Sequence, residues 1–200
     1  MKPVSVISFG AGDGDPLVSA TATETIRVAG LEAVRLGLEK ASQEVVWVLD
    51  SRARPEPHAL ETLLDSPSMP AFSLVVDGSR EPVDAFAGRV DEGDAEAVLR
   101  AVQERRVPLR WIAPTSVLAD REALLSVDAP DVGRFGGYAG IEWVVRLLRA
   151  GPPGFLVPAS RVALDVPPWR SVRSANRMRA VRAWRGTEFV RELARIVGPP

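Results

Sequence analysis

The sequence predicts an α/β fold, a mainly parallel sheet flanked by helices, from three observations. Strand-like and helix-like segments alternate through the first half of the 200 residues, the order typical of parallel sheets. Residues 44–50 form an almost continuous apolar run, as in strands with both faces covered. Residues 4–9 are a second apolar run, and it ends in a loop rich in Gly and Asp. We therefore expect buried strands joined by helices and loops.

Each further element follows from its own pattern. Residues 24–29 alternate in period two, which predicts a strand, and residues 31–41 place apolar side chains on one helical face. Pro55 favours the start of a helix, and Gly151 favours the end of another. The expected strands are 4–9, 24–29, 44–50, 71–78, one through Trp111, one after Pro114, and 155–164. The expected helices are 31–41, 55–65, 94–106, one from Asp120, 141–151, and most of the chain after 167.

Composition excludes several kinds of site. The chain has 46% hydrophobic residues, no Cys and one His. This excludes disulfides, thiol nucleophiles and zinc sites built from Cys or from His alone. No apolar run approaches the roughly 18 residues of a membrane span, and the N-terminus lacks a signal-peptide pattern, so we expect a cytoplasmic protein.

The chain is expected to divide into a main domain, residues 1–166, and a basic helical extension, residues 167–200. The net charge is −1, yet the segment from Trp169 to the C-terminus contains eight Arg and only two Glu. This charge predicts either a solvated helix face or a surface for a protein partner or an anionic membrane, which would make the protein membrane-peripheral. We expect no nucleic-acid partner.

Two long segments carry a family resemblance. They are VRLGLEKASQEVVWVLDSRARPEPHALETLL, residues 34–64, and WIAPTSVLADREALLSVDAPDVGRFGGYAGIEWVVRLLRAG, residues 111–151. In order and spacing they resemble the family 2 glycosyltransferases of GT-A fold, especially the branch with rhamnosyl- and galactofuranosyltransferases. The resemblance implies a nucleotide-diphosphate sugar as donor and a single displacement at the anomeric carbon. It also implies an N-terminus shortened by a βα unit.

The sequence departs from the family pattern where the family binds metal and accepts a proton. Asp50 matches the first carboxylate of the family's acidic turn, but Ser51 and Arg52 follow it. The acidic pair before the family's next helix and the His that ends its late strand are replaced by Ala139, Gly140 and Leu164. A divalent cation would lose its main ligands, so we expect no metal and no other cofactor.

Asp50 and Arg52 remain as candidate donor-binding residues. Asp50 lies at the end of a predicted strand, where open α/β sheets bind ligands, although an Asp there also caps turns. The Arg52 guanidinium offers a planar fork to diphosphate oxygens. The alternative is a solvated Arg52 that pairs with Glu56.

Glu142 is the candidate catalytic base, since it lies close to the missing carboxylates. The alternative is an ion pair with Arg146, four residues on. Three aromatic residues are candidates for a wall that stacks on a sugar ring, or for core positions: Trp111, Tyr138 and Trp143.

Three functions remain open. The first is a glycosyltransferase-like protein of family 2 descent with lost or impaired metal-dependent transfer, which in the extreme case is a pseudoenzyme. The second is a non-catalytic module that docks on a glycosyltransferase or an envelope-assembly complex. The third is a metal-independent transferase that uses Arg52 and Glu142.

Overall fold

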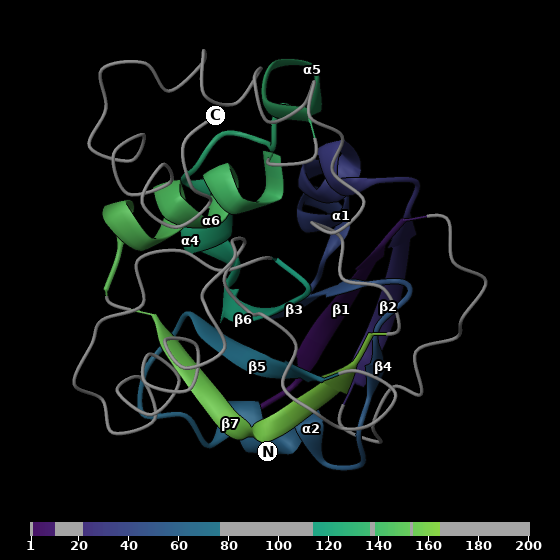
Figure 1. Ribbon diagram of the computed structural model, residues 1–200, viewed down its shortest axis with the longest axis vertical. Helices are drawn as coiled ribbons and strands as arrows, with labels where there is room; N and C mark the ends of the chain where they lie inside the picture. The colour runs from purple at the N-terminus through teal and green to yellow at the C-terminus, as the bar shows by residue number, and fades with distance from the viewer. Residues whose placement is uncertain (1, 11–21, 77–113, 137–138, 153, 165–200) are drawn as a thin grey trace, which may run out of the picture.

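The computed structural model describes residues 2–10, 22–76, 114–136, 139–152 and 154–164. Its strands form one sheet in the order β2-β1-β3-β6-β5-β7-β4 (Figure 1). The strands are β1 (Val4–Phe9), β2 (Ala22–Val28), β3 (Val45–Asp50), β4 (Arg54–Pro55), β5 (Ala71–Val76), β6 (Ser116–Asp120) and β7 (Phe155–Ala163).

The sheet is mixed rather than mainly parallel. Within the described strands, β1 pairs in parallel with β2 and β3, and β5 pairs in parallel with β7. The pairings of β3 with β6, of β5 with β6, and of β4 with β7 are antiparallel. An apolar run indicates that both faces are covered but not which way the strand points, so the direction of β6 was not predictable from its composition.

Helices cover both faces of the sheet. They are α1 (Val34–Lys40), which follows the short helix η1 (Leu31–Ala33), α2 (Ala59–Leu64), α4 (Arg121–Leu125), α5 (Val132–Phe135) and α6 (Ala139–Ala150). Figure 1 shows α1, α4, α5 and α6 on one side and α2 on the other. Two separate apolar clusters correspond to these two sides.

The alternation of side chains along the strands divides the core between the two faces. In β3, Val46 and Val48 join the cluster beneath α1 and α6, whereas Trp47 and Leu49 join the cluster beneath α2. Successive residues of a strand point to opposite faces, so one fully buried strand supplies both clusters. The predicted burial of residues 44–50 on both faces is confirmed over β3.

The predicted helix at Pro55 begins later than expected. Arg54–Pro55 is the short edge strand β4, paired with β7, and α2 starts at Ala59. Proline has no N–H to donate and is tolerated on an edge strand. His58 before the helix has a left-handed backbone, with φ 67°. Pro55 was therefore compatible with the start of a helix and with an edge strand. The structure has the edge strand, which pairs with β7.

A chain of hydrogen bonds crosses the middle of the sheet. Ser160 Oγ donates to the carbonyl of Ala59 at 2.8 Å, so it accepts from Ser73 Oγ at 2.8 Å. Ser73 Oγ has then used its one proton, so it accepts a hydrogen bond from Ser116 Oγ at 2.7 Å. Ser116 Oγ in turn accepts a hydrogen bond from Trp47 Nε1 at 2.9 Å. All three hydroxyls are buried. The chain joins β3, β6, β5 and β7 to α2.

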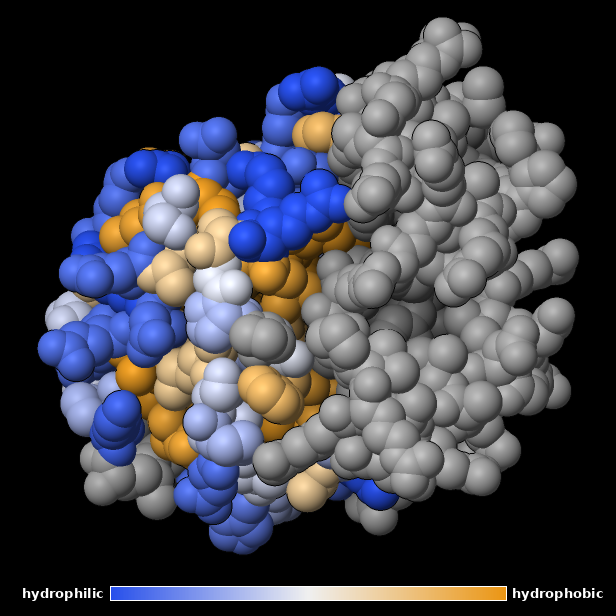
Figure 2. Space-filling view, turned by 90° about the vertical axis from the view of Figure 1, so that its left-hand side faces the viewer, coloured by the Kyte–Doolittle hydropathy of each residue, from blue (hydrophilic) through white to orange (hydrophobic). Residues whose placement is uncertain are grey.

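Several expectations fall on residues that the structure does not describe. They are the strand through Trp111, the helix over 94–106, and the division into residues 1–166 and 167–200 with its basic tail. Among the described helices, none is long and apolar enough to cross a membrane. The described part of the face in Figure 2 carries hydrophilic side chains around smaller hydrophobic areas.

Candidate functional site

The ends of β1, β2 and β3 meet at one edge of the sheet. The Ser51 N–H donates to the Phe9 carbonyl at 2.8 Å, and the Gly10 N–H donates to the Val28 carbonyl at 3.2 Å. Gly10 has φ +115°, and a Cβ at this position would lie 2.8 Å from Ser51 Oγ. Glycine permits both this backbone and this close approach. The carboxyl ends of parallel strands are where such sheets bind ligands.

Asp50 and Arg52 form one contact at this edge. Asp50 Oδ1 accepts hydrogen bonds from the Arg52 backbone N–H at 2.9 Å and from Nε at 3.0 Å, while Oδ2 accepts from Nη2 at 2.7 Å. The Asp50 side chain is 4% exposed and that of Arg52 is 50% exposed. The hydrogen bond to Asp50 raises the pKa of Arg52 above its usual value. The partner of Arg52 is thus the neighbouring carboxylate, and Asp50 also caps its own turn.

The start of α6 lies beside this edge. The Asp50 N–H donates to the carbonyl of Thr115 at 2.9 Å, and Thr115 follows Pro114 in the chain. A Cβ at Gly140 would come within 2.5 Å of Pro114 Cγ and 3.0 Å of Leu31 Cδ2. The absence of a side chain at Gly140 therefore lets α6 pack closely against the segment that holds Asp50.

Thr115 was not singled out by its sequence. Its side chain is buried, and Oγ1 has no hydrogen-bond partner within the described part of the chain. Buried hydroxyls are normally hydrogen-bonded, and exceptions call for an explanation such as a bound water or ion. No sequence pattern distinguishes such a hydroxyl from one that has a partner.

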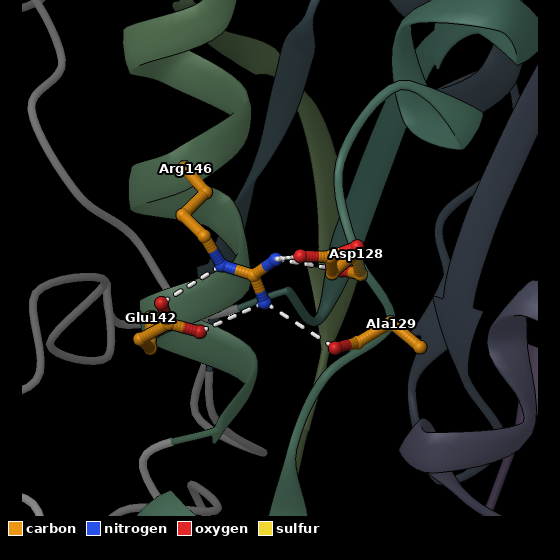
Figure 3. A network of polar contacts seen from close by, with 4 residues as sticks. All are labelled: Asp128, Ala129, Glu142 and Arg146. Carbon is orange, nitrogen blue, oxygen red and sulfur yellow. Dashed lines mark hydrogen bonds and ion pairs between the residues drawn. The ribbon is translucent and has the colours of Figure 1, made fainter. Parts of the chain in front are cut away.

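Glu142 belongs to a second network. Its Oε1 accepts from Arg146 Nε at 2.8 Å, and its Oε2 accepts from Nη2 at 2.9 Å (Figure 3). Arg146 also donates to the carbonyls of Asp128 at 2.9 Å and Ala129 at 3.3 Å. Glu142 is 8% exposed. The pair ties α6 to the segment before α5, and both carboxylate oxygens are engaged.

The structure brings Asp50 and Arg52 together but joins neither of them to Glu142 through a described hydrogen bond. Trp143, on α6, is 1% exposed and belongs to the hydrophobic core. A core position was the alternative to a role in a sugar-stacking wall. Trp111 and Tyr138 lie outside the described ranges.

The described residues do not fit a divalent cation as they stand. No group of three carboxylate or imidazole side chains lies together among them. The Asp50 carboxylate already accepts three hydrogen bonds from Arg52. A hard divalent cation requires several oxygen ligands, so Asp50 alone does not provide a site.

Comparison with known proteins gives structural similarity only. No family model matches the chain, and no curated protein matches it. Glucosyl-3-phosphoglycerate synthase from Mycobacterium tuberculosis, solved with Mg²⁺ and UDP, superposes with a TM-score of 0.56 at 17% identity. That match covers 92% of this chain and 78% of the synthase.

Two other structures have similar TM-scores. GalNAc-T7, solved with UDP, GalNAc and Mn²⁺, has a TM-score of 0.55 and 15% identity, over 92% of this chain and 47% of that one. A mycobacterial protein has a TM-score of 0.55 and 18% identity, over 92% of this chain and 74% of that one.

The expectation that the chain needs no divalent metal is contradicted by solved structures of similar fold. The synthase and GalNAc-T7 both hold Mg²⁺ or Mn²⁺ together with UDP. Counting carboxylates in one turn could not reveal this, because ligands to a hard cation also come from other segments, from water and from the bound diphosphate. At these identities the comparisons establish the architecture: the chain has a GT-A-type glycosyltransferase fold.

Proposed function

We propose that this chain is a glycosyltransferase-like protein that binds a nucleotide-diphosphate sugar at the edge formed by β1 and β3. The observation that carries the proposal is the buried Asp50 carboxylate, which holds the half-exposed Arg52 guanidinium at the carboxyl end of β3. Solved proteins of the same fold bind UDP. The order of motifs supports descent from family 2.

Arg52 supplies the chemistry that a diphosphate needs. Asp50 engages Nε and Nη2, and no described residue engages Nη1. A guanidinium oriented by a carboxylate presents its remaining N–H groups in a fixed plane, which suits bidentate contact with phosphate oxygens. Asp50 therefore acts as a positioning residue for Arg52, and Arg52 as the anion-binding residue.

We further propose that sugar transfer is impaired. A general base must reach the acceptor hydroxyl and have a free oxygen to take its proton. Both oxygens of Glu142 are held by Arg146. Transfer through Glu142 would require this pair to open, and that supports a binding role ahead of a working transferase.

A titration of UDP-glucose by calorimetry, in buffer with Mg²⁺, tests the binding site. We expect Asp50→Asn to weaken binding about tenfold, because Arg52 loses the charge-assisted hydrogen bonds that orient it. The matched control is Asp128→Asn, whose side chain is 99% exposed, and it should leave binding unchanged. No binding of UDP-glucose or of other nucleotide-diphosphate sugars, or equal loss in both variants, would contradict the proposal.

The same samples test catalysis. The proposal expects no measurable transfer or hydrolysis of bound UDP-glucose, and no change in Glu142→Gln. Turnover by the wild type that Glu142→Gln abolishes would show that the carboxylate works as a base and that transfer is intact.

A further inference from the structure

We propose that the pair of Asp50 and Arg52 selects a nucleoside diphosphate with a free terminal phosphate over the same diphosphate esterified to a sugar. The chain then holds the nucleotide that sugar transfer leaves behind more tightly than it holds the donor. This inference rests on the proposed function, since it names the ligand that the same site prefers.

The Arg52 guanidinium has one occupied edge and one open edge. A guanidinium carries five N–H groups in one plane. Asp50 accepts from Nε at 3.0 Å and from Nη2 at 2.7 Å, so it occupies the edge that these two nitrogens share. No described residue accepts a hydrogen bond from Nη1. The edge between Nη1 and Nη2 therefore offers two parallel N–H groups to a ligand.

The turn fixes the direction of the open edge. The Arg52 backbone N–H donates to Asp50 Oδ1 at 2.9 Å. The Asp50 N–H donates to the Thr115 carbonyl at 2.9 Å, and the Ser51 N–H donates to the Phe9 carbonyl at 2.8 Å. The Asp50 side chain is buried, whereas that of Arg52 is half exposed. The guanidinium is thus oriented before a ligand arrives, which lowers the entropy lost on binding.

The charge of the pair makes the ligand's own charge decisive. The charges of Asp50 and Arg52 cancel, so the pair exerts little long-range attraction on anions, and its preference depends on the hydrogen bonds that Arg52 donates. Such bonds strengthen with the charge on the acceptor. A free terminal phosphate carries a charge of about −2 at pH 8, whereas a phosphate esterified to a sugar carries a single negative charge. Arg52 therefore binds the free phosphate more strongly.

The number of phosphate oxygens favours the same ligand. The open edge of Arg52 accommodates two oxygens of one phosphate. A free terminal phosphate has three equivalent oxygens, so any two of them can face Arg52. In a nucleotide sugar only two oxygens of that phosphate are unesterified, and both must face Arg52, which restricts the direction of the sugar. The esterified ligand thus loses more orientational freedom when it binds.

Calorimetric titrations of UDP, the β-methyl ester of UDP and UDP-glucose test this preference, all at pH 8 in one Mg²⁺ buffer. We expect UDP to bind about tenfold more tightly than UDP-glucose, the size of one strengthened charge-assisted hydrogen bond. The methyl ester lacks the second negative charge but carries no sugar, so it should bind as UDP-glucose does. A methyl ester that binds as tightly as UDP would overturn the inference, because the sugar alone would then weaken UDP-glucose.

Two variants identify the residue responsible. Arg52→Gln removes the charged fork, and we expect UDP and UDP-glucose to come within about threefold of each other. Arg54→Gln is the matched control, since Arg54 is an exposed arginine two residues further along the chain; it should keep the preference for UDP. Thermal melting confirms that both variants are folded. A preference that persists in Arg52→Gln, or that Arg54→Gln abolishes equally, would overturn the inference.

The inference and the proposed function fail in different ways. UDP-glucose that binds the wild type as tightly as UDP would overturn the inference and leave the proposed function standing. Binding of UDP that depends on Arg52, without binding of any nucleotide-diphosphate sugar, would contradict the proposed function alone. No binding of UDP would overturn the inference as well.

Discussion

Removing the Ser73 hydroxyl should destabilise the protein through one specific loss. Ser73 stands in the middle of the chain of hydrogen bonds between Trp47 and Ala59. In Ser73→Ala, Ser160 still donates to the Ala59 carbonyl, whereas the Ser116 hydroxyl loses its acceptor. Both residues are buried, so water does not readily replace the missing partner.

The expected loss in the free energy of unfolding follows from the one hydroxyl that loses its acceptor. One buried donor left without a partner costs about 1–3 kcal/mol. For a protein of this size, each kcal/mol lowers the melting temperature by about 2–4 °C. The free energy of unfolding would be measured by urea denaturation, with the melting temperature from circular dichroism as a second readout.

A matched serine provides the control. Ser126 donates to the carbonyl of Ala123 on an exposed helix end, and Ser126→Ala should change stability by less than about 0.5 kcal/mol. If Ser73→Ala cost no more than Ser126→Ala, the directed chain of buried hydroxyls would not be a stabilising feature, and the reasoning would be refuted.

Three other predictions concern stability. Glu24 accepts hydrogen bonds from Ser5 and Ser42, which lower its pKa, so Glu24→Gln should be less stable than the wild type at pH 7. Urea denaturation should show this difference in stability shrinking as the pH falls below about 4, the usual Glu range. Thr115→Val removes a buried hydroxyl that has no described partner and should be neutral or stabilising by up to about 1 kcal/mol in thermal melts; a clear loss would reveal a partner. Arg146→Ala leaves the Glu142 carboxylate without its hydrogen bonds and should cost about 2–3 kcal/mol by urea denaturation, with a cost under about 0.5 kcal/mol as the contradicting result.

Much of the fold was predictable because apolar runs mark buried strands. β1, β3 and β5 are each buried along their whole length, and the sequence shows this directly. Strand direction was not predictable, since β6 is apolar whether it runs parallel or antiparallel to β3. The start of α2 was missed because Pro55 suits an edge strand as well as a helix start.

The candidate site was predictable in position and less so in detail. Asp50 at the end of an apolar run marks the edge where ligands bind. Its contact with Arg52 depends on the shape of one turn, and the unpartnered hydroxyl of Thr115 depends on packing between distant parts of the described chain. The pairing of Glu142 with Arg146 follows from helical spacing, and the structure contains it. The expectation of no metal is contradicted by solved proteins of the same fold, which hold Mg²⁺ or Mn²⁺, because a motif alone does not show which oxygens surround an ion.

A crystal structure of the chain with UDP and Mn²⁺ would test the central claim most directly. The account predicts the diphosphate beside Arg52, at the carboxyl end of β3, with the Arg52 guanidinium still hydrogen-bonded to Asp50. A diphosphate bound elsewhere on the chain, or a crystal that takes up no UDP at saturating concentration, would contradict it.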